Sequence, residues 1–318
     1  MSKIAIIGAG LVGATTAYAF MLGGTVQEIV LIDKVQEKAR GEAMDLSHGA
    51  SFVSPVNVYA GDYADCRDAD IILITAGAAQ VAGQSRLELV ETNSRIIKEI
   101  VSNILEYNTD AILIVVTNPV DIMAYIAWKM SDFPFARVIG SGTVLDTSRF
   151  RHLLSEHCGI DPRNIHAYVI GEHGDSEVPL WSTVNIAGIS MDRFCQNCTR
   201  ACSEQGKEQI RNKVRRAAYE IIASKGATYY AIALALRRIT ESILRNEHSI
   251  LTVSTLIRGV YGINDLYLSL PCVLGRKGVE DVIPFELDAE EKEQFLRSAK
   301  IVKDCIPADL TRKPVELL

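Results

Sequence analysis

A glycine-rich turn near the start of the chain has the spacing that binds a dinucleotide. Residues 8–13 read Gly-Ala-Gly-Leu-Val-Gly, after an apolar run and before a helical pattern. Gly8, Gly10 and Gly13 permit a tight turn, close approach of a pyrophosphate to backbone N–H groups, and close helix packing. Asp33 follows Gly13 by 20 residues, where a carboxylate binds both ribose hydroxyls and repels a 2′-phosphate. We expect this group to bind NAD rather than NADP; the alternative is a structural turn with a surface acid.

A histidine in a polar turn is the candidate for proton transfer. His173 stands in Gly-Glu-His-Gly-Asp, residues 171–175, after an apolar run. Hydride transfer from a secondary alcohol also releases the hydroxyl proton, so the reaction needs a base that titrates near neutrality, and histidine is the usual group. On this pattern alone, an ordinary surface-loop histidine remains the alternative.

Three further charged residues could act with this histidine. Asp146 and Arg149 are three residues apart in a predicted helix and so lie on one face. The aspartate could orient His173 and stabilise its imidazolium, while the arginine could bind a carboxylate through two parallel hydrogen bonds. An ion pair within the helix is the alternative for this pair. Arg86 ends residues 77–86, a polar segment with two glycines that could close as a lid and bring the guanidinium to a substrate carbonyl.

The first half of the chain must position the glycine-rich turn. It alternates helical patterns with predicted strands at residues 3–7, 29–33, 56–59, 70–75, 111–117 and 137–140. Runs such as residues 71–74, Ile-Ile-Leu-Ile, are apolar on both faces, so helices must cover both faces of the sheet. This predicts an α/β fold with a doubly wound parallel sheet of the Rossmann type, whose ligand site lies beyond the carboxyl ends of the strands. Residues 75–78 form a second small-residue turn at that edge.

The second half has a different pattern, without a linker before it. We predict helices at residues 144–157, 204–224, 228–245 and 289–305, and strands at residues 165–170, 250–259 and 267–274. The chain is therefore expected to form a NAD-binding domain at residues 1–142 and an α+β substrate-binding domain at residues 143–318. The active site is expected in the cleft between them.

Composition narrows the class of protein. The 318 residues are 48% apolar and 23% charged, which is typical of a folded chain with two globular cores and excludes a predominantly disordered protein. The net charge of −6 and the lack of a Lys/Arg run argue against nucleic acid or an anionic membrane as partner. No secretory signal or apolar spanning stretch is evident, so we expect a cytoplasmic protein. Cys195, Cys198 and Cys202 could bind a soft metal, but no fourth ligand is evident nearby, and we expect no metal.

Several motifs in order resemble the family of L-lactate and malate dehydrogenases over essentially the whole chain. They are GAGLVG, ITAGAAQVAGQSRLELV, VVTNPVD, GSGTVLDTSRFR, IGEHGDSEVPLWS and KGATYYAIA. The resemblance implies that His173 is the acid/base and Asp146 its partner. It also implies that Arg149 binds the substrate carboxylate and that Arg86 is the lid arginine. A catalytically silent NAD-binding protein of the same fold is the alternative from another class.

The same resemblance implies further contacts. Asn118 would contact both nicotinamide and substrate, and the family typically has a cis bond between it and Pro119. Thr228 would touch the substrate, and Ile232 would lie beside the nicotinamide. Other residues that match cofactor-contact positions are Val12, Lys38, Tyr63, Gly77 and Ala78.

One position bears on the choice of substrate. In the family, an arginine six residues before the lid arginine distinguishes malate from lactate enzymes, because it pairs with the second carboxylate of oxaloacetate. Here that residue is Gln80, six before Arg86. A neutral amide leaves a second buried carboxylate unpaired, at a cost of several kcal/mol. The sequence therefore favours pyruvate and L-lactate, with malate or another L-2-hydroxy acid as the alternative.

A regulatory site is also implied. Arg151 follows Arg149 by two residues, so the two side chains point about 200° apart on a helix and cannot share one ligand. Arg151 and His166 resemble the pair that binds fructose 1,6-bisphosphate across a subunit interface in bacterial members of the family. The resemblance implies activation by this sugar phosphate, and a homotetramer.

Overall fold

The computed structural model describes residues 2–78, 86–196 and 203–307. Three residues of the sequence predictions, Gln80, Cys198 and Cys202, lie outside these ranges. Arg86 is described by its main chain alone, as the first residue of a helix. None of the helices within the described ranges is both long and apolar enough to cross a bilayer.

Six parallel strands form the first part of a large sheet, as predicted from the sequence. Their order is β3-β2-β1-β4-β5-β6. The strands are β1 (Lys3–Ile7), β2 (Glu28–Ile32), β3 (Asn57–Ala60), β4 (Ile71–Ile74), β5 (Ile112–Val115) and β6 (Val138–Gly140). Strand order reverses between β1 and β4, and a doubly wound sheet has its ligand crevice at such a point, outside the carboxyl ends of the strands.

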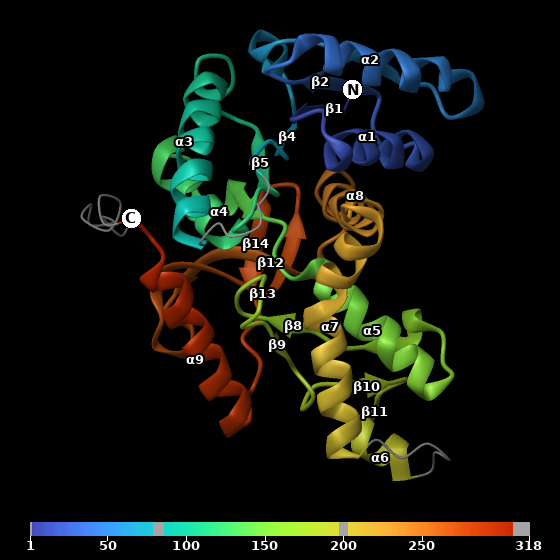
Figure 1. Cartoon of the computed structure of the whole chain (residues 1–318), viewed down its shortest axis with the longest axis vertical. Helices are drawn as coiled ribbons and strands as arrows, with labels where there is room; N and C mark the ends of the chain where they lie inside the picture. Colours follow the sequence, from blue (N-terminus) through green and yellow to red (C-terminus); the bar gives the residue numbers. More distant parts are fainter. Residues whose placement is uncertain (1, 79–85, 197–202, 308–318) are drawn as a thin grey trace.

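Helices cover both faces of this sheet, which explains why most residues of its strands are apolar (Figure 1). Alternate residues of β1 face opposite ways: Ala5 and Ile7 pack in one hydrophobic cluster, Ile4 and Ile6 in another. Helices α3 (Arg86–Leu105) and α4 (Val120–Ser131) supply side chains to the first cluster. Helices α1 (Leu11–Gly23), α2 (Gln36–His48) and α8 (Tyr230–Leu244) supply the second.

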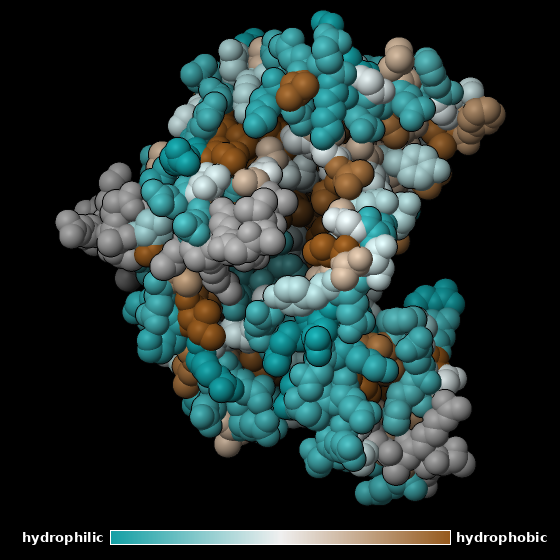
Figure 2. All heavy atoms as spheres, viewed as in Figure 1, coloured by the Kyte–Doolittle hydropathy of each residue, from teal (hydrophilic) through white to brown (hydrophobic). Residues whose placement is uncertain are grey.

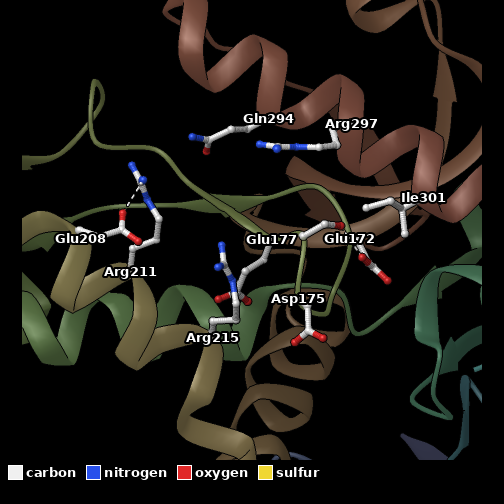
Figure 3. Close-up of a pocket in the computed structure, with 10 residues that line it drawn as sticks. Glu172, Asp175, Glu177, Glu208, Arg211, Arg215, Gln294, Arg297 and Ile301 are labelled. Carbon is white, nitrogen blue, oxygen red and sulfur yellow. Dashed lines mark hydrogen bonds and ion pairs between the residues drawn. The ribbon is translucent and has the colours of Figure 1, made fainter.

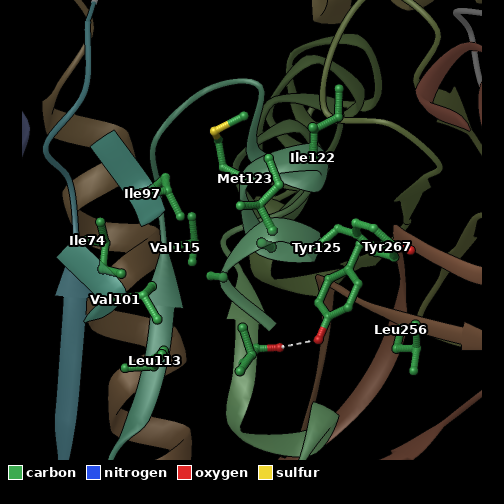
Figure 4. Close-up of a cluster of buried hydrophobic side chains, with 14 of the residues drawn as sticks. Ile74, Ile97, Val101, Leu113, Val115, Ile122, Met123, Tyr125, Leu256 and Tyr267 are labelled. Carbon is green, nitrogen blue, oxygen red and sulfur yellow. Dashed lines mark hydrogen bonds between the residues drawn. The ribbon is translucent and has the colours of Figure 1, made fainter. Parts of the chain in front are cut away.

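The sheet does not end at β6. Three antiparallel strands continue it, in the order β6-β12-β13-β14, and make it nine-stranded. They are β12 (Ser249–Arg258), β13 (Asn264–Gly275) and β14 (Gly278–Val282). The sequence pattern predicted β12 and β13, at residues 250–259 and 267–274, but not β14. It also did not predict that β12 joins β6, a junction with one paired position, Ser254 opposite Gly140. Figure 4 shows the interior beside the junction, where Tyr125 and Met123 of α4 pack near Tyr267 of β13.

The second half adds helices α5 (Val144–Cys158), α6 (Met191–Gln196), α7 (Glu204–Lys225) and α9 (Ala289–Asp304). One small sheet has β10 (Asn185–Ile186) in the middle, between β7 (Ile165–His166) and β11 (Ile189–Ser190). Another pairs β8 (Val169–Ile170) with β9 (Val178–Pro179). Five short 3-10 turns complete the described chain: η1 (Ala50–Phe52), η2 (Tyr63–Cys66), η3 (Phe135–Arg137), η4 (Pro162–Asn164) and η5 (Val260–Gly262).

The single strand expected at residues 165–170 is therefore wrong, because two strands in different sheets stand there. Side chains of α5 explain the break, since they bond to main-chain groups where a ladder would otherwise continue. Arg151 Nε donates to the carbonyl of Ala167 at 3.0 Å, and the N–H of Val169 donates to Thr147 Oγ1 at 2.9 Å.

The surface is hollowed between the two halves of the chain. Figure 2 shows this recess on the face viewed in Figure 1, below the part formed by α1 and α2, with hydrophobic residues on its walls. The structure thus has a recess on this face, and that the active site lies there stays a prediction.

Candidate active site

The glycine-rich turn joins β1 to α1 in a conformation that excludes side chains. Gly8 has φ +109°, and a β-carbon on Gly13 would lie 1.9 Å from the carbonyl oxygen of Gly8. Asp33, directly after β2, holds this turn: its carboxylate accepts the N–H of Ala9 at 2.8 Å and that of Val35 at 2.9 Å. The first turn of α1 has no side-chain cap, so its N–H groups and positive helix end are suited to an anion.

A buried asparagine ties together the two turns that follow β4 and β5. Asn93 of α3 accepts the N–H of Ala78 at 2.8 Å and donates to the carbonyl of Asn118 at 2.7 Å. The sequence analysis missed this residue. Its spacing was a usable signal, because Asn93 follows Arg86 by seven residues and so lies on the same face of a helix two turns later.

The remaining residues expected to bind cofactor or substrate differ in how closely they approach these turns. Lys38 of α2 places its Nζ 3.9 Å from a β-carbon built on Gly10. Val12 of α1 and Ile232 of α8 are half-buried and pack against one hydrophobic cluster. The other positions are less closely tied to the turn: Gly77 is packed against Thr117, Tyr63 is half-buried in η2, and Thr228 is half-buried between α7 and α8.

His173, Asp146 and Arg149 form one connected group. His173 Nδ1 lies 2.5 Å from Asp146 Oδ2, and Arg149 donates from a terminal guanidinium nitrogen to Asp146 Oδ1 at 2.8 Å. The Asp146 side chain is 2% exposed and that of His173 is 24% exposed. The ion pair within the helix is thus present, and it coexists with the contact to His173. Asp146 takes one of the five N–H donors of Arg149 and leaves the others for a ligand.

Burial and neighbouring charges have opposite effects on the pKa values of His173 and Asp146. Burial lowers the pKa of His173, but the neighbouring carboxyl groups, Asp146 foremost, together outweigh it and raise that pKa to about 9. Burial disfavours the ionised form of Asp146, yet His173 and Arg149 hold the pKa of this carboxyl below its usual range. At neutral pH the pair is therefore an imidazolium and a carboxylate, with Nε2 of the ring left to donate a proton.

The turn that carries His173 is fixed from α9. Gly171 has φ +88°, and a β-carbon there would lie 2.8 Å from Ser298 Oγ. Ser298 Oγ accepts the N–H of Glu172 at 2.8 Å and lies 3.0 Å from Ser176 Oγ. This side chain thus bonds to both arms of the turn and limits its movement.

Beside the turn lies a cavity of about 390 Å³ with charged walls (Figure 3). Arg211 and Arg215 extend into it from α7 and Arg297 from α9. Glu177, from the turn that carries His173 (residues 171–177), is buried, and its Oε1 has no hydrogen-bond partner among the described residues. Burial raises the pKa of Glu177 well above its usual value, and the charge of Asp146 adds to this effect. The sequence analysis missed Glu177, although it stands in the quoted motif IGEHGDSEVPLWS.

The pair expected to bind a regulator consists of Arg151 on α5 and His166 on β7. The guanidinium carbon of Arg151 lies 5.4 Å from the ring centre of Tyr168, and burial lowers the pKa of Arg151. His166 is exposed on β7, next to Ala167, whose carbonyl Arg151 binds. The two residues thus lie on adjoining segments of one surface.

The peptide bond between Asn118 and Pro119 is cis, as the resemblance implied.

Comparisons with known proteins agree over both halves of the chain. Residues 2–140 match the model for the lactate/malate dehydrogenase NAD binding domain, and residues 143–310 match that for the lactate/malate dehydrogenase alpha/beta C-terminal domain. The L-lactate dehydrogenase of Thermoanaerobacter pseudethanolicus is 56% identical over 306 residues, covering 96% of this chain and 98% of the relative. That of Acetivibrio thermocellus is 54% identical over 307 residues and covers 96% of each chain.

Solved structures show the same likeness. A lactate dehydrogenase from a Medee basin deep-sea metagenome library superposes with a TM-score of 0.93 at 45% identity, covering 98% of this chain and 99% of the other. The minor L-lactate dehydrogenase of Enterococcus mundtii, in a ligands-bound form, has a TM-score of 0.93 at 39% identity and covers 99% of both chains.

Proposed function

This chain belongs to the lactate/malate dehydrogenase family, and on that premise we propose that it is an L-lactate dehydrogenase that interconverts pyruvate and L-lactate. Its cofactor is NAD. The observation that carries the proposal is the group of His173, Asp146 and Arg149, which combines a proton donor with a carboxylate-binding cation.

The proposed roles follow from the charges of these residues. NADH, when bound, supplies a hydride to C2 of pyruvate. His173 donates its Nε2 proton to the carbonyl oxygen, which becomes the hydroxyl of lactate, and the neutral ring remains bonded to Asp146. The free N–H groups of Arg149 bind the substrate carboxylate. In the reverse direction the neutral ring takes the hydroxyl proton, and the Asp146 carboxylate stabilises the imidazolium that forms.

One arginine and three polar uncharged residues complete the proposal for the substrate site. Arg86, at the start of α3, would polarise the carbonyl, and Gln80 would face the substrate methyl. Asn118 and Thr228 would contact the substrate from the turn after β5 and from the segment before α8.

The cofactor would bind along the glycine-rich turn. Support comes from the uncapped start of α1, which suits the pyrophosphate, and from Asp33, which stands at the end of β2 with its carboxylate already fixed. We assign cofactor contacts to the turn glycines and their neighbours, namely Gly8, Gly10, Val12, Gly13, Asp33, Lys38, Tyr63, Gly77, Ala78, Asn118 and Ile232.

The direct test of this function is NADH oxidation by the purified chain, with and without pyruvate. We expect pyruvate-dependent oxidation that declines as the pH rises through about 9, because reduction needs protonated His173. Lactate oxidation should instead increase over that range, because it needs the neutral ring. No pyruvate-dependent oxidation at any pH would reject the proposed function.

We further propose that the protein is a cytoplasmic homotetramer, and that each subunit has a NAD-binding domain at residues 1–142 and a substrate-binding domain at residues 143–318. We also propose that fructose 1,6-bisphosphate activates it by binding to Arg151 and His166. Their placement on adjoining segments of one surface supports a shared phosphate site. Across a symmetry axis, two such cationic patches repel until a doubly phosphorylated sugar bridges them, which favours the assembled state.

Pyruvate saturation with and without fructose 1,6-bisphosphate tests this site. We expect the effector to lower KM about 5- to 150-fold in the wild type, the usual range of allosteric coupling. Arg151→Gln should lose most of this response. Arg163→Gln is the control, because Arg163 is an exposed arginine of η4 paired with Asp161. A wild type without activation, or an Arg151 variant with full activation, would reject the site and leave the catalytic roles unaffected.

A further inference from the structure

Asp121 is a buried carboxylate that links the start of α4 to the catalytic turn. It is the second residue of α4 and is 2% exposed. Its Oδ2 accepts the main-chain N–H of His173 at 2.8 Å, and its Oδ1 accepts the hydroxyl of Ser254 at 2.6 Å. Asp121 stands in the motif VVTNPVD, but nothing in the sequence pointed to a partner 52 residues away.

The surroundings stabilise the ionised form of this carboxylate. Burying an unpaired carboxylate is costly. Here both oxygens accept hydrogen bonds, which are stronger when the acceptor is charged. Asp121 also lies in the first turn of α4, where the helix dipole favours negative charge.

Ser254 gives Asp121 a rigid support. It lies in the middle of β12, at the position that pairs with Gly140 of β6. Contact there is close, because a β-carbon on Gly140 would lie 2.8 Å from Cβ of Ser254. Three segments therefore meet at one carboxylate: the start of α4, the central strand β12 and the turn of His173.

The link also reaches the turn that would contact nicotinamide and substrate. Asn118 lies three residues before Asp121, and its carbonyl is fixed by Asn93. The position of the His173 main chain is thus set relative to that of Asn118 through one short, buried stretch of chain.

We propose that Asp121 is a positioning residue that holds the catalytic turn in place relative to Asn118, and that Ser254 orients its carboxylate. The inference rests on the proposed function, because only that function gives His173 a proton to deliver to a substrate held beside Asn118. Proton and hydride transfer both demand close alignment, and a displacement of about 1 Å costs on the order of 100-fold in rate.

The charge of Asp121 also acts on His173. After the opposing effect of burial and the larger effect of Asp146, Asp121 helps to raise the pKa of His173. Of the other titratable and charged groups nearby, Glu177 on the same turn also raises this pKa, and Arg149 on α5 is paired with Asp146. Charge and position can therefore be separated by two substitutions.

Asp121→Asn removes the charge but keeps an oxygen that can accept the His173 N–H. Ser254→Ala keeps the charge but removes the hydrogen bond that orients it. Asp132→Asn is the matched control, because Asp132 is an exposed residue at the other end of α4 whose left-handed conformation asparagine tolerates.

The experiment measures single-turnover NADH oxidation by pyruvate across pH in each full-length variant, with NADH affinity from fluorescence titration. We expect Asp121→Asn to lower the rate about tenfold or more and to move the alkaline limb to lower pH, with NADH affinity within about twofold. Ser254→Ala should lower the rate several-fold without moving the limb. Asp132→Asn should match the wild type.

Two results would overturn the inference. The first is that Ser254→Ala and a folded Asp121→Asn both have the same single-turnover rate and pH profile as the wild type. The other is an equal loss of NADH affinity and rate in either folded variant, which indicates general disruption. If Asp121→Asn does not fold, Ser254→Ala alone decides by the same criteria. An inactive wild type, by contrast, rejects the proposed function itself.

Discussion

Replacing His173 by alanine is expected to lower kcat for pyruvate reduction by roughly 100- to 10,000-fold, the usual contribution of a general acid. Affinity for NADH should change little, because the glycine-rich turn and Asp33 are separate from the catalytic turn. Steady-state kinetics with both substrates and a fluorescence titration with NADH measure the two effects. His152→Ala is the control, since His152 lies on the exposed side of α5, 3.5 Å from Glu156.

A near-normal kcat in the His173 variant would remove this residue from the mechanism. Asp146→Asn supplies a second check. The amide can still contact the ring, but it cannot stabilise an imidazolium, so the pKa of His173 should fall. The loss should be smaller than that of His173→Ala, and the alkaline limb of pyruvate reduction should move to lower pH.

The substitution Gln80→Arg is expected to shift preference from pyruvate toward oxaloacetate by about 100-fold or more in the ratio of kcat/KM values. The new guanidinium would pair with a second carboxylate whose unpaired burial costs several kcal/mol, and each 1.36 kcal/mol is tenfold in rate. Gln80 lies outside the described residues, so this expectation rests on its spacing from Arg86 and on the family resemblance. Initial rates over a range of each substrate give the ratio.

Gln80→Met is the control for this specificity change, because it keeps a similar length without charge. It should gain no activity with oxaloacetate. If the arginine variant also gains none, residue 80 does not face the substrate side chain.

Local pattern was enough to predict the parallel sheet. Most of its strands are short apolar runs that alternate with helical patterns, and the turn after β1 carries glycines where the backbone leaves no space for a side chain. The same logic failed at β14, where Glu280 and Asp281 are exposed and only the first two residues are buried. A five-residue strand with two adjacent charged residues has no periodicity from which to predict it.

Contacts between distant residues were harder to predict than elements. The resemblance indicated that Asp146 partners His173, but spacing alone could not show that residues 27 positions apart lie 2.5 Å from each other. Asn93 and Asp121 were missed for the same reason: each is a polar residue within a helix, and its significance appears only when its partners are folded against it. Glu177 was missed because the residues that line a cavity with it lie on α7 and α9, far along the chain.

The hydrophobic cluster on the α3 and α4 side of the sheet crosses from one half of the chain into the other. It joins Val115 and Ile122 of the first half to Ile170, Leu270 and Phe295 of the second within one continuous interior. Rotating the halves apart as rigid bodies would expose this shared apolar surface to water and carry a large free-energy penalty. The scaffold beneath the catalytic group is therefore preorganised, and the free energy gained on binding substrate need not be spent on assembling it.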